Sequence, residues 1–226
     1  MQWIPNVSEN GVDVHDVIIF LGPSLPVPEA EKILPAIYRL PVRRVDLLEV
    51  IRERPCIVGI IDGVFFEEAA VGHREVLQVM KSGISVIGAS SMGALRAAEL
   101  EPFGMIGVGE VFRMYRDGEI ESDDEVALIY DPATGTALSE PLVNIRVTLK
   151  HGVSTGFFTS DEAEMVLNTG KSLWYPDRSW SKIISMCDLD PMRKESIRIW
   201  LKDNQIDQKR EDAIAALLYI RERFCS

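Results

Sequence analysis

Three short runs of β-branched and aliphatic residues constrain this sequence most, because each is stopped by a turn residue and followed by an amphipathic helix. The runs are 14–21, 56–61 and 84–87. They are nearly continuous in apolar character, so the strands are expected to be buried on both faces. Strands of this kind that alternate with helices build a parallel sheet. We therefore predict an α/β protein with a Rossmann-like parallel sheet flanked by helices.

The helices of this pattern are predicted at 28–34, 44–53, 73–83 and 92–100. From about residue 152 the sequence becomes helical throughout. Thr159 and Glu162 have the spacing of a capping box, before a helix expected to end at Gly170. Three aspartates are predicted to cap later helices, namely Asp177, Asp190 and Asp207. We predict an α/β core domain over residues 1–150 and an α-helical C-terminal extension over 151–226.

The charge of the chain narrows the class of partner. Its formal net charge is −11, with 24 basic and 35 acidic residues, which argues against a nucleic acid or an anionic membrane as the main partner. The three cysteines are far apart and form no paired motif, so a reducing compartment is expected. The N-terminus lacks the features of a signal peptide, and the prediction is a cytoplasmic protein.

Motifs for cofactors and metals are absent from the sequence. It contains neither a phosphate loop nor a dinucleotide fingerprint, and the acidic run 119–125 lacks the glycine and spacing of a calcium loop. That run is predicted to be a solvated loop. We expect no cofactor and no metal, and whether the chain forms a homo-oligomer stays open.

Three loops are expected at the carboxyl edge of the sheet, where open α/β proteins bind their ligands. They are 21–24, 62–66 and 89–93. The third reads Ala-Ser-Ser-Met-Gly and has the spacing of a nucleophile elbow, with alanine in place of the first glycine. Ser91, or Ser90 beside it, could present a nucleophilic hydroxyl there, while helix-start N–H groups stabilise an oxyanion. The same serines equally suit an N-cap, or a helix-start site for a phosphate or carboxylate.

A serine nucleophile requires a base, and the chain has three histidines. His15 and His151 are predicted to be structural. His73 is expected at a helix start just beyond the second loop, on the same side as Ser91, although an exposed first-turn residue would look the same. Asp62 at the tip of the second strand could orient the imidazole or bind a cation, and Asp-Gly is also ordinary turn chemistry.

Four blocks then follow one another in a specific order: IIDGVFFEEAAVGHREVL (60–77), VIGASSMGALRAAELEPFGMIGVGEVF (86–112), DGEIESDDEVAL (117–128) and SEPLVNIRVTL (139–149). Over about residues 17–150 the chain resembles the core domain of TfuA-like proteins. The resemblance implies a partnership with YcaO enzymes, which use ATP to modify backbone amides of peptides, in thioamidation and in the maturation of ribosomal peptide natural products. It also implies that a thiocarboxylated, ubiquitin-like carrier of the ThiS type is hydrolysed to release sulfide for YcaO.

That activity is acyl transfer, for which Ser91 as nucleophile and His73 as base are the predicted pair. Arg96 is predicted to bind the thiocarboxylate, and Gly93 to line a cleft of small residues. The other predicted binding residues are Arg74, Glu75, Asn144 and Arg146. Arg96, Asn144 and Arg146 could instead serve in surface ion pairs or packing.

Two positions depart from the pattern of TfuA-like proteins. Arg74 stands where lysine is expected, and arginine is a poor base because it stays protonated. Val45 stands where glycine is usual. Beside the hydrolase we therefore keep two alternatives, a non-catalytic adaptor that recruits carrier or precursor peptide to YcaO, and a small-molecule hydrolase unrelated to sulfur.

Overall fold

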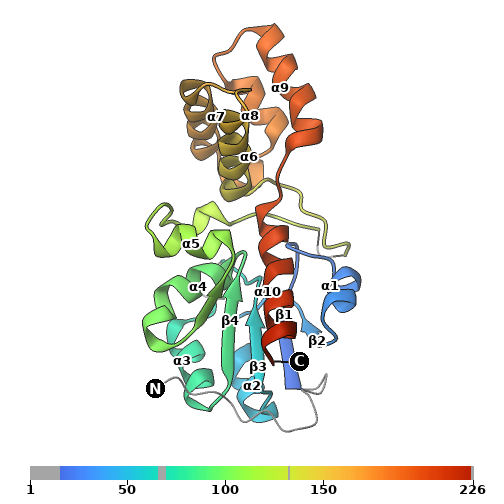
Figure 1. Cartoon of the computed structure of the whole chain (residues 1–226), viewed down its shortest axis with the longest axis vertical. Helices are drawn as coiled ribbons and strands as arrows, with labels where there is room; N and C mark the ends of the chain where they lie inside the picture. Colours follow the sequence, from blue (N-terminus) through green and yellow to red (C-terminus); the bar gives the residue numbers. More distant parts are fainter. Residues whose placement is uncertain (1–15, 66–69, 132, 225–226) are drawn as a thin grey trace. The chain divides into compact units, whose positions relative to one another are not determined.

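The structure is a computed structural model that describes residues 16–65, 70–131 and 133–224. The chain divides into two compact units (Figure 1). The first unit comprises the residues up to Asp123 together with those from Lys209 onward, and the second comprises Asp124–Gln208. Residues 14 and 15 of the first predicted strand, with His15, lie outside the described residues.

The first unit is built on a five-stranded sheet in which every pairing is parallel, with strand order β2-β1-β3-β4-β5. This confirms the Rossmann-like class. Three strands coincide with the apolar runs: β1 (Val17–Phe20), β3 (Ile57–Ile60) and β4 (Ser85–Ala89). The edge strands β2 (Ile37–Arg39) and β5 (Ile106–Val108) were not predicted, because three half-buried residues are too few to show a period.

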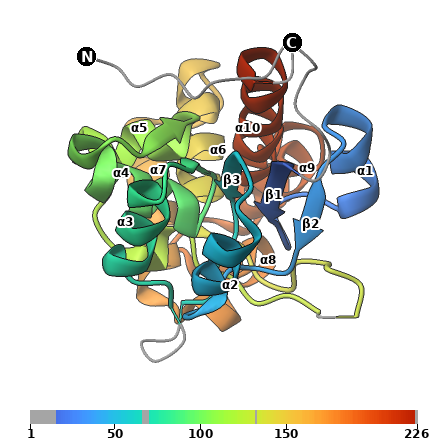
Figure 2. The same cartoon turned by 90° about the horizontal axis from the view of Figure 1, so that it is seen from below.

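Helices cover both faces of this sheet (Figure 2). The helix α1 (Val27–Ile33) and the last helix, α10 (Gln208–Phe224), pack on one face. The helices α2 (Asp46–Glu53), α3 (His73–Lys81) and α4 (Met92–Leu100) follow strand steps in the opposite direction, and right-handed crossovers place them on the other face. A further helix, α5 (Glu110–Arg116), follows β5.

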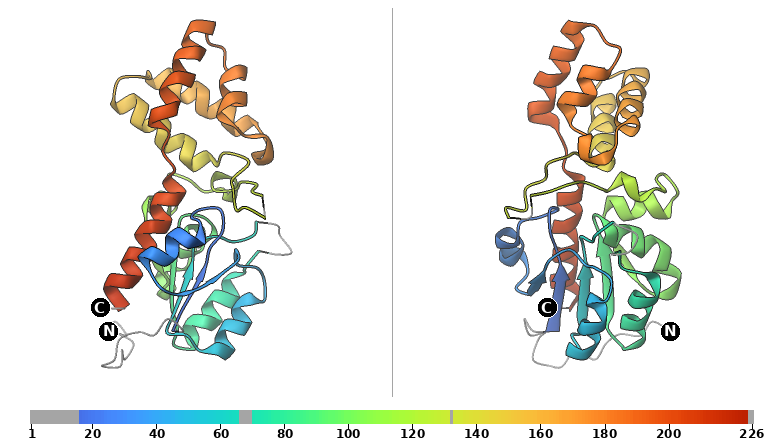
Figure 3. Two further views of the ribbon diagram at one scale, coloured as in Figure 1. Left: turned by 90° about the vertical axis from the view of Figure 1, so that its right-hand side faces the viewer. Right: turned by 180° about the vertical axis from the view of Figure 1, so that it is seen from behind.

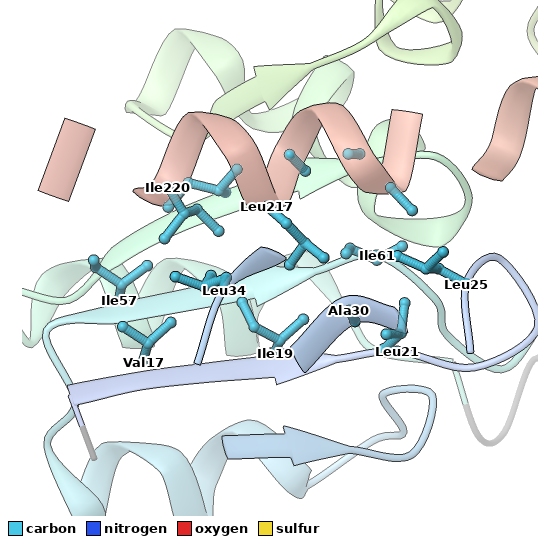
Figure 4. Close-up of a cluster of buried hydrophobic side chains, with 14 residues drawn as sticks. Val17, Ile19, Leu21, Leu25, Ala30, Leu34, Ile57, Ile61, Leu217 and Ile220 are labelled. Atoms are coloured by element: carbon cyan, nitrogen blue, oxygen red, sulfur yellow. The ribbon is translucent and has the colours of Figure 1, made fainter. Parts of the chain in front are cut away.

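The last helix belongs to the first unit, which differs from the expected extension over 151–226. Leu217 and Ile220 of α10 are fully buried in one apolar cluster with Ile19 and Ile57 of the sheet (Figure 4). Asp212 adds a polar tie, because its carboxylate accepts the backbone N–H groups of Glu110 (2.9 Å) and Val111 (2.7 Å) at the start of α5. The structure thus divides the chain at 123/124 and 208/209, because burial of the apolar stripe of α10 returns the chain end to the sheet.

The second unit is helical, with its helices coloured yellow to orange in Figure 3. They are α6 (Leu142–Ser154), α7 (Ser160–Ser172), α8 (Trp180–Met186) and α9 (Pro191–Asn204). The capping box is confirmed, because Glu162 N–H donates to Thr159 Oγ1 and Thr159 N–H donates to Glu162. Asp190 caps α9 as predicted, whereas Ser179 rather than Asp177 caps α8 and α7 runs past Gly170.

A fully buried arginine ties the second unit together. Arg178 has 1% of its surface exposed and donates to the carbonyl groups of Gly170 (3.1 Å) and Leu173 (3.0 Å). Its Nη2 also lies 2.7 Å from Oδ2 of Asp124. Every one of these partners belongs to the second unit. The Arg178 side chain thus holds the first residue of this unit, Asp124, and the end of α7.

A second arginine links α9 to the start of α7. Both oxygens of Glu162 accept hydrogen bonds from Arg193, at 2.8 and 2.9 Å, and the guanidinium also donates to the Phe157 carbonyl and stacks over that ring. The bonds from Arg193 lower the pKa of the Glu162 carboxyl. A carboxyl with a lowered pKa stabilises the fold above its unfolded-state pKa, and this contribution is lost as the pH falls through the folded-state value.

We therefore expect Glu162→Gln to destabilise the protein by about 0.5–1 kcal/mol at neutral pH and to have little effect below the lowered pKa of Glu162. Urea unfolding of both proteins across this pH range measures the difference. A gap between them that stays constant down to acid pH would contradict the role of the ionised carboxylate.

Val45 adopts a backbone conformation that valine rarely takes. Its φ is 73° and its ψ is −17°, in the left-handed region, and its side chain is 58% exposed. The conformation is held because Val45 N–H donates to Oε1 of Glu75 (2.6 Å), on α3. The structure thus explains why glycine is expected at this position, since only glycine adopts these angles without strain.

We expect Val45→Gly to raise the free energy of unfolding by up to about 1 kcal/mol, because relief of left-handed strain outweighs the added entropy of the unfolded chain. Thermal and urea unfolding measure the effect, with Val45→Ala as the control that keeps most of the strain. A less stable glycine variant would show that the valine side chain stabilises the fold.

Among the residues that the structure describes, no helix is both long enough and apolar enough to cross a membrane.

Candidate functional site

The carboxyl ends of β1, β3 and β4 bring three loops together at the point where the strand order changes direction, between β1 and β3. Ligand sites of open α/β sheets form at such switch points. The backbone fixes the loops: Asp62 N–H donates to the Phe20 carbonyl (3.1 Å), and Val42 N–H donates to the Asp62 carbonyl (2.9 Å). Asp62 therefore stands at the centre of this edge, as predicted for the strand tip.

The Asp62 side chain is buried and surrounded by donors. Its Oδ2 accepts the N–H groups of Gly22 (2.9 Å) and Ser24 (3.1 Å), and its Oδ1 accepts the Ser24 hydroxyl at 2.7 Å. The ammonium of Lys209 lies 4.0 Å from the same Oδ1, and both side chains are 3% exposed. A buried carboxylate is stable when it is paired in this way.

Ser90 extends the network. Its hydroxyl oxygen lies 2.9 Å from Oγ of Ser24 and 2.8 Å from the Lys209 carbonyl oxygen. A hydroxyl has one proton to donate. Ser24 gives its proton to Asp62, so Ser90 shares its own proton between Ser24 and the Lys209 carbonyl. When it donates to Ser24, a continuous chain of hydrogen bonds leads from Ser90 to Asp62.

A positive φ and the hydrogen bonds of its hydroxyl distinguish Ser90 from Ser91. Ser90 has a φ of 66°, one of the few left-handed residues other than glycine in the described chain. Strain of this kind concentrates at functional sites, and the nucleophile of an elbow sits on such a sharp strand-to-helix turn. Ser91 has a negative φ of −124° with an uncommon ψ of −122° and occupies the N-cap position of α4, but its hydroxyl does not cap the helix.

The glycines around the turn allow close packing. A Cβ on Gly93 would lie 1.6 Å from the Ile60 carbonyl oxygen, and a Cβ on Gly88 would lie 2.1 Å from the Gly93 carbonyl oxygen. Gly93, predicted in the binding set, is thus required for α4 to lie against β3. At the start of this helix the Met92 N–H has no acceptor among the residues that the structure describes.

His73 does not reach either serine in the described structure. Its Nε2 lies 2.7 Å from Oε2 of Glu99, near the far end of α4, and the same oxygen accepts Nη1 of Arg96 at 2.6 Å. Arg96 also donates to the Val71 carbonyl (3.0 Å). These three side chains form a surface cluster of their own, so the predicted Ser91–His73 pair stays a prediction for which the geometry offers no contact.

Of the residues next to His73, Glu75 binds the loop that precedes α2. Glu75 accepts the N–H groups of Gly72 (2.8 Å) and Val45 (2.6 Å), and so closes the start of α3. Arg74 is exposed. Their predicted part in binding remains a prediction.

Asn144 and Arg146 belong to the second unit and make bonds within it. Asn144 donates to Glu140 (3.2 Å) and Asp207 (3.1 Å). Arg146 forms two hydrogen bonds, of 2.7 and 2.6 Å, with the carboxylate of Glu125. Glu125, at the end of the acidic run, is buried, so this part of the run is not the solvated loop expected. Within the described ranges no cluster of side chains is suited to hold a metal ion.

Sequence reasoning missed Ser24 and Lys209. Ser24 lies in the predicted loop 21–24, whose position at the sheet edge was the available signal. Lys209 lies 119 residues after Ser90 and was assigned to a helical extension, so no local pattern connected it to the site.

The arrangement defines a class, an α/β protein with a strained serine, a second hydroxyl and a buried carboxylate–lysine pair at the switch point of its sheet. The chain belongs to the TfuA-like family, since the family model described as TfuA-like protein matches residues 62–179. Asp62 and Ser90 lie within the matched range, whereas Ser24 and Lys209 lie outside it. No curated protein matches the chain. The family is associated with YcaO-dependent thioamidation, and membership supports a role as a YcaO partner.

Proposed function

We propose that this protein hydrolyses a thiocarboxylated, ubiquitin-like carrier of the ThiS type and supplies the sulfide to a YcaO enzyme for backbone thioamidation. Family membership supports the partnership. The observation that carries the hydrolase proposal is the buried chain of hydrogen bonds from Ser90 through Ser24 to Asp62, with Lys209 at its end. Nucleophile, proton acceptor and positive charge are the parts that acyl transfer requires.

In the first step Ser90 Oγ attacks the carbonyl carbon of the carrier thiocarboxylate. Its proton passes to Ser24, whose own proton moves to the Asp62–Lys209 pair. The tetrahedral intermediate collapses when a proton returns to sulfur, so that HS⁻ leaves and an ester of Ser90 remains. The C–S bond is exchanged for a C–O bond, and no electrons are transferred.

In the second step water attacks the ester. The same network accepts the proton of water and returns one to Ser90, which releases the carrier with an ordinary carboxylate. The Met92 N–H, at the first position of the helix that follows the turn, is the backbone donor assigned to the oxyanion. Sulfide is a good leaving group, so a site without a histidine suffices.

The burial of the two serines favours the second candidate, a non-catalytic adaptor that recruits carrier or precursor peptide to YcaO. Ser90 is 0% and Ser91 1% exposed. Catalysis therefore requires that binding of the carrier tail opens the loops that cover the site, whereas an adaptor requires no opening.

Incubation of the protein with a thiocarboxylated ThiS-type carrier, followed by intact mass of the carrier, separates the two candidates. We expect the mass to change by the replacement of sulfur with oxygen, with sulfide released in equal amount, and YcaO not to be required. A carrier that remains thiocarboxylated with and without YcaO, while it binds the protein, would leave the adaptor as the function.

A further inference from the structure

The segment that leads from β2 into α2 exposes large apolar side chains. Leu40 is 77%, Val45 58% and Leu48 40% exposed. Leu48 and the exposed Arg52 are four residues apart in α2 and so share one face of it, and Val45 immediately precedes the helix. We name the β2–α2 patch as these three residues together with Leu40 and the exposed Arg43.

Fold stability does not account for the residue at the centre of the patch. Val45 combines a left-handed backbone, which is costly for a β-branched residue, with an apolar side chain that is mostly in water. Glycine would relieve the strain, and a polar residue would remove the exposed apolar surface. Contact with a partner would account for a strained and exposed valine.

The charge of the patch contrasts with that of the whole chain. Residues 39–54 contain five arginines and three acidic residues, in a protein of net charge −11. One of these acids, Glu53, is paired with Arg39. An apolar centre with arginines beside it complements a partner surface that has an apolar centre and acidic residues around it.

The patch lies next to the candidate site within the first unit. Val42 N–H donates to the Asp62 carbonyl (2.9 Å), and Val64 N–H donates to the Val42 carbonyl (3.1 Å). Val42 is thus bonded to the loop that carries the site carboxylate and precedes Val45 by three residues. A protein bound at the patch would have a short path for its chain terminus to the carboxyl edge of the sheet.

We propose that the β2–α2 patch binds the folded domain of the carrier protein whose thiocarboxylate tail enters the site at Asp62, through an acidic surface around an apolar centre. This rests on the proposed function. Binding of the folded domain raises the local concentration of the tail at the site, while the serine network carries out the hydrolysis.

The experiment measures kcat and KM for a thiocarboxylated ThiS-type carrier with Val45→Gly and Arg52→Glu. We expect each variant to raise KM about 10-fold with kcat nearly unchanged, and Val45→Gly to melt no lower than the wild type. This combination separates binding from folding, because a damaged fold would lower the melting temperature. Matched controls are Phe103→Gly and Arg223→Glu, exposed residues outside the patch, which should leave KM unchanged.

Unchanged KM in both patch variants, with an active wild type, would overturn the patch while the proposed function stands. If the wild type hydrolyses nothing, the proposed function fails, and titration of the same variants with the unmodified carrier still tests the patch through Kd. Sedimentation tests whether the patch instead binds a second copy of the chain. A dimer that Val45→Gly dissociates would show this and overturn the proposal.

Discussion

Ser90→Ala is expected to reduce hydrolysis of the thiocarboxylated carrier by about 10³-fold or more, with the fold retained. The substitution removes the attacking oxygen and the start of the proton path to Asp62. Alanine fits the space that serine leaves, so the turn and the start of α4 should persist. The lost hydrogen bond to the Lys209 carbonyl should lower the stability only modestly, by about 1 kcal/mol.

Single-turnover assays of sulfide release, with carrier mass as a second readout, measure this effect. Ser91→Ala is the matched control on the next residue, and we expect it to retain most of the activity because the Ser91 hydroxyl has no partner in the network. The reverse outcome, with Ser91→Ala inactive and Ser90→Ala active, would restore the nucleophile predicted from the sequence and remove the relay from the mechanism.

Arg178→Met is expected to destabilise the second unit by about 2–4 kcal/mol, the largest effect on stability that we predict for a single side chain. Methionine fills much of the space but donates no hydrogen bond. The carbonyl groups of Gly170 and Leu173 would lose a donor, and the Asp124 carboxylate would lose its ion-pair partner. Unmet acceptors in a buried place carry the full cost of their desolvation.

Urea unfolding followed by tryptophan fluorescence is a suitable measurement, since Trp174, Trp180 and Trp200 all belong to the second unit. Arg198→Met is the matched control, because that arginine is exposed and pairs with Glu195 one turn away (3.4 Å). Its expected effect is below about 0.5 kcal/mol. Equal effects of the two substitutions would show that burial of Arg178 contributes nothing.

The strands with nearly continuous apolar runs and the helices with a clear period were predictable from sequence. The runs that became β1, β3 and β4 are nearly continuous in apolar residues, and the capping box at Thr159 and Glu162 is a local signal that the structure reproduces. The short edge strands were missed because three residues show no period. The packing of α10 on the sheet was not predicted, because an apolar stripe indicates that a helix is buried but not which surface it packs against.

The candidate site was predictable in part. Asp62 and the serine turn were found because the ends of parallel strands meet at one edge, a consequence of local pattern and topology together. His73 was predicted as the base by residue type and position, and this role stays a prediction. In the described structure its Nε2 contacts Glu99, whereas Ser24 and Lys209 lie near Asp62. Such contacts join residues far apart in the chain, and no spacing encodes them.

The sequence by itself determined the class of fold, the loops at the sheet edge and the family resemblance, because these follow from hydrophobic patterns, turn residues and the order of short motifs along the chain. Only the tertiary structure decided which serine takes the strained turn, which lysine pairs with Asp62 and which helix returns to the sheet. These features depend on contacts between residues far apart in the sequence. A buried charge is stable only beside an opposite charge, and an apolar helix face only against another apolar surface.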